Sequence, residues 1–217
     1  MLKSPVLFSF LIIDYLPDMK FFPLIFTSIL FLFSCKDPGI AKRKAAQPEI
    51  NPRSSWNAVA PKAFATHVPV RITVHHEGTK LLATDDAIRK IKGIQTWGMG
   101  PDRKWADVPY HFFIAPDGKI YEGRDINTVG ETNTEYNPAG HLLICCLGNY
   151  EEYEVPEAQL QSLIRLIAWC STTYKIPAET LATHRDFSKQ TTCPGKNLYR
   201  YFESGFIKEG VRKILEK

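Results

Sequence analysis

Two histidines and a cysteine, in segments far apart in the chain, are the residue types of a metal site. The first histidine belongs to the pair His75 and His76 in the segment 73–76, whereas His184 and Cys193 belong to a polar, turn-rich segment near the other end of the chain. Structural zinc sites use four protein ligands, but a catalytic zinc uses three nitrogen or sulfur ligands and leaves its fourth position to water or substrate. If folding brings the two segments together, these side chains predict a catalytic zinc site.

Apolar periodicity indicates the elements that would position these residues. The pattern predicts strands over residues 68–76 and 142–147, a hairpin of strands 110–115 and 119–122, and helices over 87–97, 156–174 and 206–215. Gly118 can take the positive φ that the hairpin turn needs. Helices that alternate with short strands around one hairpin indicate an α/β fold, with a central mixed β-sheet flanked by helices in a single domain.

The strand over residues 68–76 ends in two adjacent histidines, whose side chains point to opposite faces of a sheet. One of them, His75 or His76, can therefore reach a site on a given face, and the other is expected to be structural or to support the site. The apolar stripe of the helix over 87–97, which includes Ile88 and Trp97, is expected to face the core.

Three further cysteines are expected to be core residues. Cys145 and Cys146 lie in an apolar run, and Cys170 lies on the apolar side of a predicted helix. They form no framework of evenly spaced pairs. Of the four cysteines that follow the N-terminal region, Cys193 is the one that lies in a polar, turn-rich segment.

Composition favours one globular domain and argues against a nucleic-acid partner. The chain has 217 residues and 44% hydrophobic content, enough for a sizeable core. The net charge is +4, and the Lys and Arg residues are scattered without interleaved aromatics. A slightly positive surface would suit an anionic polymer such as a cell wall, although solvated surface charge is the simpler explanation.

The N-terminal region resembles the signal of a bacterial lipoprotein. An apolar run over residues 21–33 leads into Cys35, and the residues three and one before it, Leu and Ser, match a lipobox. A membrane-spanning helix needs about 20 apolar residues, whereas an export signal needs about 7 to 15. We therefore predict an export signal over residues 1–35, with Met19 as a candidate translation start and with Cys35 lipidated. An uncleaved signal anchor is the alternative.

Residues 36–47 are rich in Lys, Ala, Pro and Gly and lack apolar periodicity, which predicts a flexible tether. The domain is then expected over residues 48–217. Together with the signal, this arrangement predicts an exported, lipid-anchored protein of a bacterial cell envelope.

Six ordered segments resemble the zinc N-acetylmuramoyl-L-alanine amidases, a family that includes the peptidoglycan recognition proteins and phage T7 lysozyme. The segments are residues 53–56, 75–76, 105–112, 117–124, 148–150 and 184–195. The resemblance implies a mixed sheet with helices on both sides and a zinc ion in a groove on one face. It also implies cleavage of the amide between N-acetylmuramic acid and L-alanine, with peptidoglycan or its muropeptides as the partner.

Carried over by position, the resemblance implies that His75, His184 and Cys193 bind zinc. It makes Tyr110 the active-site tyrosine and places Thr191 near the zinc-bound water. Zinc lowers the pKa of bound water to about 7 and polarises an amide carbonyl. We expect Tyr110 to stabilise the oxyanion instead of acting as a base, because an unperturbed phenol has a pKa of about 10.

Two other functions are weighed against the zinc amidase. Members of the family that lack the cysteine bind peptidoglycan without cutting it, so the presence of Cys193 with both histidines favours catalysis. A metal-free hydrolase using Cys193 and His184 is less well supported, because Pro194 follows the cysteine and nothing indicates a helix N-terminus that would lower its pKa.

Several aromatic and histidine residues of the matching segments are expected to be structural. Trp56 and Trp105 are expected to pack in the core instead of stacking on a sugar. His111 alternates away from Tyr110 and is not expected to be a ligand, and His141 is expected to be a partly buried structural residue.

Overall fold

The computed structural model describes residues 44–216. The expected export signal, its Met19 start and the lipidation site Cys35 lie outside the described residues. Within residues 44–216, no helix is long and apolar enough to cross a membrane. Ala45, in the segment expected to be a tether, is buried, and its N–H donates a hydrogen bond to Thr172 Oγ1 at 3.3 Å. Packing against the domain therefore begins upstream of the expected domain start.

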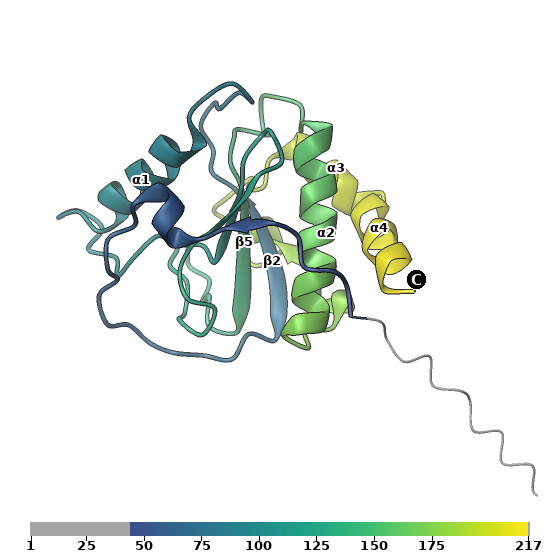
Figure 1. Ribbon diagram of the computed structural model, residues 1–217, viewed down its shortest axis with the longest axis horizontal. Helices are drawn as coiled ribbons and strands as arrows, with labels where there is room; N and C mark the ends of the chain where they lie inside the picture. Colours follow the sequence, from purple (N-terminus) through teal and green to yellow (C-terminus); the bar gives the residue numbers. More distant parts are fainter. Residues whose placement is uncertain (1–43, 217) are drawn as a thin grey trace, which may run out of the picture. The chain divides into compact units, whose positions relative to one another are not determined.

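Six strands of the described chain form one mixed sheet in the order β1-β4-β3-β5-β2-β6 (Figure 1). β3 and β4 are antiparallel, as the hairpin pattern predicts, and the other neighbouring strands are parallel. Gly118 in the hairpin turn has a φ of 87°. The strands are β1 Ile50–Asn51, β2 Arg71–His76, β3 Phe112–Ile114, β4 Ile120–Glu122, β5 His141–Cys146 and β6 Ala182–Thr183.

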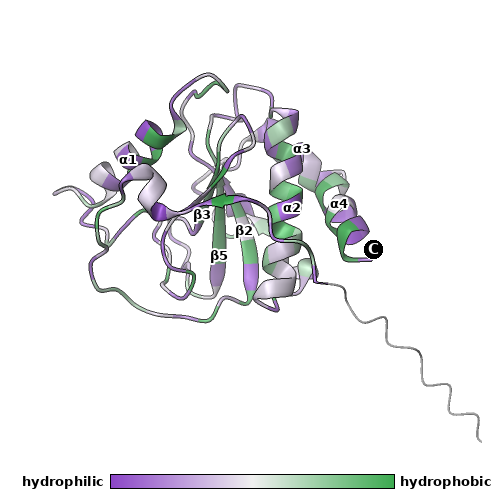
Figure 2. Ribbon diagram, viewed as in Figure 1, coloured by the Kyte–Doolittle hydropathy of each residue, from purple (hydrophilic) through white to green (hydrophobic). Residues whose placement is uncertain are grey.

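Helices cover both faces of this sheet (Figure 1). α1 lies on one face, and α2 and α4 pack on the other, where the larger core is formed with Ile72, Val74 and Ile144. The smaller core joins α1 to the opposite side chains of the strands, such as Phe113 and Cys145. β5 is buried throughout and hydrophobic over most of its length (Figure 2), so it forms the centre of both cores. The helices are α1 Ala87–Gly98, α2 Glu157–Thr173, α3 Lys196–Glu203 and α4 Phe206–Leu215.

The α/β fold predicted from the sequence is confirmed, but two segments differ from expectation. The expected strand over 68–76 begins only at Arg71, because Val68 and Val70 are exposed and do not join the sheet. The expected core stripe of α1 is also wrong in part. Ile88 is 37% exposed, and Trp97 is 49% exposed because it lines an open groove.

Candidate metal centre and groove

Sheet register places the two expected histidine ligands next to each other. β2 and β6 are parallel and pair Val74 with Thr183, so the residues that follow, His75 in β2 and His184 just after β6, lie side by side. Their ring centroids are 4.6 Å apart. Both side chains are buried, because they lie at the strand ends between the sheet and the loops that cover it.

Cys193 reaches the same point through the loop between η3 (His184–Asp186) and α3. Its carbonyl accepts a hydrogen bond from the N–H of Arg185 at 2.9 Å, which folds the loop back on itself. The N–H of His76 lies 3.3 Å from Cys193 Sγ and donates to it. The thiol sulfur is 3.7 Å from His75 Nδ1. One potential ligand atom from each of His75, His184 and Cys193 lies within 4.8 Å of the others.

This donor set fits a zinc ion. Tetrahedral zinc, with Zn–S near 2.3 Å and Zn–N near 2.0–2.1 Å, requires sulfur and nitrogen about 3.6 Å apart. The observed separation of Cys193 Sγ and His75 Nδ1 is 3.7 Å. Burial lowers the pKa of His184 to about 4 and that of His75 well below its usual value, so both rings are neutral, as metal ligation requires.

The Nε2 atom of each of these two rings lies within hydrogen-bond distance of a hydroxyl group. His184 Nε2 is 2.7 Å from Thr134 Oγ1, and His75 Nε2 is 3.4 Å from the phenol oxygen of Tyr136. Nδ1 is therefore the nitrogen that each ring has free for a metal. Thr134 and Tyr136 were not found from the sequence, because their loop has no periodicity or motif that signals a site.

The two expected catalytic residues line the same small cavity as the three expected ligands. The cavity has a volume of about 220 Å³. The ring of Tyr110 lies 5.1 Å from that of His75, and burial raises the pKa of Tyr110 well above its usual value, so the phenol keeps its proton. The Thr191 hydroxyl accepts a hydrogen bond from the N–H of Cys193 at 3.0 Å, which leaves its own hydrogen free to be donated.

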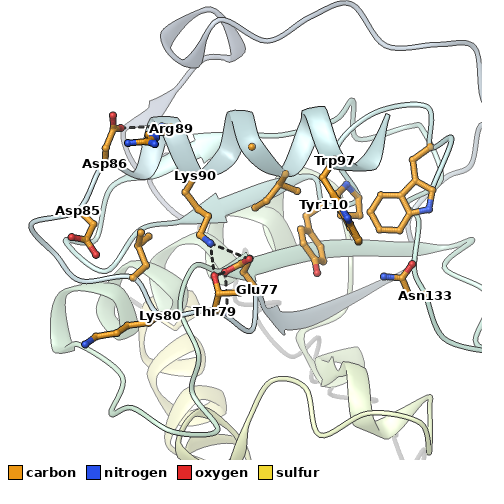
Figure 3. A pocket seen from close by; sticks show the side chains of 15 residues that line it. Glu77, Thr79, Lys80, Asp85, Asp86, Arg89, Lys90, Trp97, Tyr110 and Asn133 are labelled. Atoms are coloured by element: carbon orange, nitrogen blue, oxygen red, sulfur yellow. Dashed lines mark hydrogen bonds and ion pairs between the residues drawn. The ribbon is translucent and has the colours of Figure 1, made fainter. Parts of the chain in front are cut away.

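A larger groove of about 830 Å³ continues from this cavity along α1. The two hollows share wall residues, among them Glu77, Trp105 and Tyr110. Figure 3 shows Lys90 reaching from α1 toward Glu77 and Thr79 at the end of β2. The ammonium nitrogen of Lys90 is 3.3 Å from Glu77 Oε1. Glu77 directly follows the histidine pair but could not be identified as a groove residue from the sequence.

Trp105 is a groove residue, so its expected place in the core is wrong. It is only partly buried, and it packs edge-on against Trp97 with centroids 5.3 Å apart. A helix pattern or an aromatic residue alone does not show which side of a helix borders solvent. Trp56, by contrast, is fully buried, as expected, and its indole N–H donates to the carbonyl of Glu122 at 2.8 Å.

The remaining histidines near the sheet are engaged inside the fold. His76 Nδ1 accepts a hydrogen bond from the N–H of Tyr150 at 3.1 Å. His111 Nδ1 accepts from the N–H of Leu143 at 2.8 Å, and His141 Nδ1 is 2.9 Å from the hydroxyl of Thr73. These contacts agree with the structural roles expected for His111 and His141.

Comparison with known proteins identifies the family of this chain. A family model described as N-acetylmuramoyl-L-alanine amidase matches residues 65–196. The chain belongs to the N-acetylmuramoyl-L-alanine amidase family. It is 32% identical over 157 residues to peptidoglycan recognition protein 1 of Bos taurus, a family relative, which covers 70% of this chain and 80% of the relative.

Solved structures of the family share the fold. The N-acetylmuramoyl-L-alanine amidase LysC from Clostridium intestinale superposes with a TM-score of 0.60 and 28% identity, over 74% of this chain and 98% of that one. Peptidoglycan recognition protein LE, solved with tracheal cytotoxin, a monomeric diaminopimelic acid-type peptidoglycan, gives a TM-score of 0.64 and 29% identity, over 71% and 92% of the two chains. The family therefore contains a protein named as an amidase as well as recognition proteins, and the resemblance expected from the sequence is confirmed.

Proposed function

We propose that this protein is a zinc-dependent N-acetylmuramoyl-L-alanine amidase that hydrolyses the amide between N-acetylmuramic acid and the L-alanine of a peptidoglycan stem peptide. The observation that carries the proposal is the convergence of His75, His184 and Cys193 within 4.8 Å at one end of a long groove. A three-ligand nitrogen and sulfur set is typical of catalytic zinc. The amidase among the solved structures and the peptidoglycan-bound recognition protein support the reaction and the class of substrate.

The three ligands would hold the ion, and zinc would supply Lewis-acid polarisation of the amide carbonyl and activation of water. The protonated phenol of Tyr110 can donate a hydrogen bond to the carbonyl oxygen as negative charge develops on it. Thr191, whose hydroxyl hydrogen is free, can donate to the same region of the cavity. The indole rings of Trp97 and Trp105 offer apolar walls along which a stem peptide or sugar can be oriented.

The thiol chemistry of Cys193 argues against a metal-free cysteine hydrolase. Burial raises the pKa of Cys193 to about 12, so the side chain is a thiol at neutral pH unless a cation is bound. Such a hydrolase needs a thiolate nucleophile. Zinc stabilises a thiolate directly, which makes metal binding the chemistry that suits this cysteine.

Incubation of the purified protein with isolated sacculi tests the proposal. The expected result is soluble stem peptides that begin with L-alanine, identified by mass spectrometry, lost with a chelator and restored by zinc. Cys193→Ser should abolish release, and Cys170→Ser, which changes a buried cysteine in α2, should not. Binding to sacculi without release by the zinc-loaded protein would instead support the alternative, a non-catalytic peptidoglycan recognition protein.

We also propose that the protein is exported and held at a membrane of the bacterial envelope by a lipid on Cys35. The support is the apolar run over residues 21–33 and the lipobox that ends at this cysteine. Metabolic labelling with a fatty-acid analogue should mark the wild type and not a Cys35→Ala variant. Equal labelling of the two proteins would contradict the lipid anchor.

A further inference from the structure

One short loop contacts both expected histidine ligands and also the segment that carries the cysteine. Thr134 lies 2.7 Å from His184 Nε2, and two residues later Tyr136 lies 3.4 Å from His75 Nε2. Between them, Glu135 points to the loop that follows His184. Its carboxylate accepts hydrogen bonds from Ser188 Oγ at 2.5 Å and from the N–H of Lys189 at 3.0 Å.

We propose that Thr134, Glu135 and Tyr136 form a positioning loop that orients both imidazoles and sets the zinc affinity of the site. The inference rests on the proposed metal centre. None of the three residues is a ligand in it. They act by holding the Nε2 atoms of the rings and by tying together the segments from which the ligands come.

The hydrogen bonds around Thr134 accommodate the tautomer of His184 that metal binding through Nδ1 requires. The hydroxyls of Thr132 and Thr134 are 2.9 Å apart, and the hydroxyl of Thr134 can donate to Thr132. Thr134 Oγ1 then accepts from His184, which requires the proton to be on Nε2. The lone pair of Nδ1 is thereby directed to the metal position, since a hydrogen bond at one ring nitrogen fixes the role of the other.

Tyr136 is held in place by packing as well as by its phenol. Its side chain is 9% exposed, and its ring lies 5.3 Å from that of His141 and 6.0 Å from that of Phe187. The ring also stacks near His75, with centroids 6.4 Å apart at an interplanar angle of 29°. A rigid aromatic side chain in this position restricts rotation of the His75 ring in addition to bonding its nitrogen.

Zinc affinity and ring tautomers, measured on the full chain, test the proposal. Thr134→Val and Tyr136→Phe remove one hydroxyl each and keep the side-chain shape. Loss of such a partner typically costs about 10- to 100-fold in metal affinity, and we expect each variant to lose zinc affinity by that factor in competition with a chromophoric chelator. The matched controls Thr180→Val and Tyr201→Phe make the same changes away from the site and should stay within about twofold of the wild type on the same scale.

The tautomer gives a readout that a purely structural role would not change. In nitrogen-15 spectra of the metal-free protein, the His184 ring should be in the Nε2–H form in the wild type and lose this preference in Thr134→Val. Wild-type zinc affinity in both variants would overturn the positioning role while leaving the metal centre intact. A wild-type protein that binds no zinc would overturn the proposed metal centre and the loop's role with it.

Discussion

Gly195 is a residue at which a single added methyl group should strongly disturb the site. It lies two residues after Cys193 with φ 85° and ψ 148°, a conformation that essentially only glycine adopts. A Cβ at this position would be 2.3 Å from Glu151 N and from the carbonyl carbon of Tyr150. These are backbone atoms, so they cannot move aside as a flexible side chain would.

Gly195→Ala should therefore be strongly destabilising. The backbone conformation costs about 1–3 kcal/mol for a residue with a side chain. Overpacking adds about 1–3 kcal/mol, for a loss of about 2–6 kcal/mol in the free energy of unfolding. That is a large share of the free energy of unfolding of an ordinary domain, which is about 5–15 kcal/mol. The loop would also shift, and zinc affinity should fall because the Cys193 thiol moves away from His75.

Equilibrium urea unfolding of the metal-free protein measures this loss, because bound zinc would add its own stabilisation. Gly205→Ala is the matched control. Gly205 also has a positive φ, 74°, but a Cβ there would meet nothing within 4 Å. The control should lose only about 1–2 kcal/mol. If Gly195→Ala loses no more than Gly205→Ala, the close packing of the Cys193 loop against residues 150–151 is wrong.

Three further predictions concern the site and its surroundings. Tyr110→Phe should lower amide hydrolysis by about 10²–10³-fold, measured as turnover of a muropeptide, with binding retained, because one hydrogen-bond donor to the oxyanion is lost. Trp97→Ala should weaken sacculus binding in a sedimentation assay and leave thermal stability nearly unchanged. Its comparison, Trp56→Ala, empties a fully buried position and should lower the free energy of unfolding by about 3–5 kcal/mol. Glu131→Ala should lower the free energy of unfolding in urea by about 3–5 kcal/mol, since it leaves the buried guanidinium of Arg124 without its ion-pair partner. A loss under about 1 kcal/mol would show that this ion pair contributes no more than one on the surface.

Periodicity was sufficient for the elements that bury a continuous apolar surface. β5 and α2 are long enough, and buried enough, that the apolar pattern alone indicates them. The two-residue strands β1 and β6 show no period, and α3 buries only Leu198, so neither kind of element could be recognised. β6 nevertheless matters greatly, because its register with β2 is what sets His184 beside His75.

A metal site could be predicted because histidine and cysteine are themselves the chemical signal, whereas the choice of His75 over His76 came from the family resemblance. His75, His184 and Cys193 converge as expected, although more than a hundred residues of sequence separate His75 from the other two. Residues that act through contacts made only after folding could not be predicted. Thr134 and Tyr136 are ordinary loop residues in the sequence, and their proposed role depends on the histidines that they contact only in the folded chain.

Titration of the metal-free protein with zinc, while hydrolysis of a soluble muropeptide is followed, shows whether catalysis depends on the metal. No stem peptide should be released without metal, and release should rise with added zinc up to one equivalent per chain. A Cys193→Ser protein should stay inactive across the same titration. Full activity in the metal-free wild type, or no activity at any zinc concentration despite stoichiometric binding, would show that the protein is not a zinc amidase.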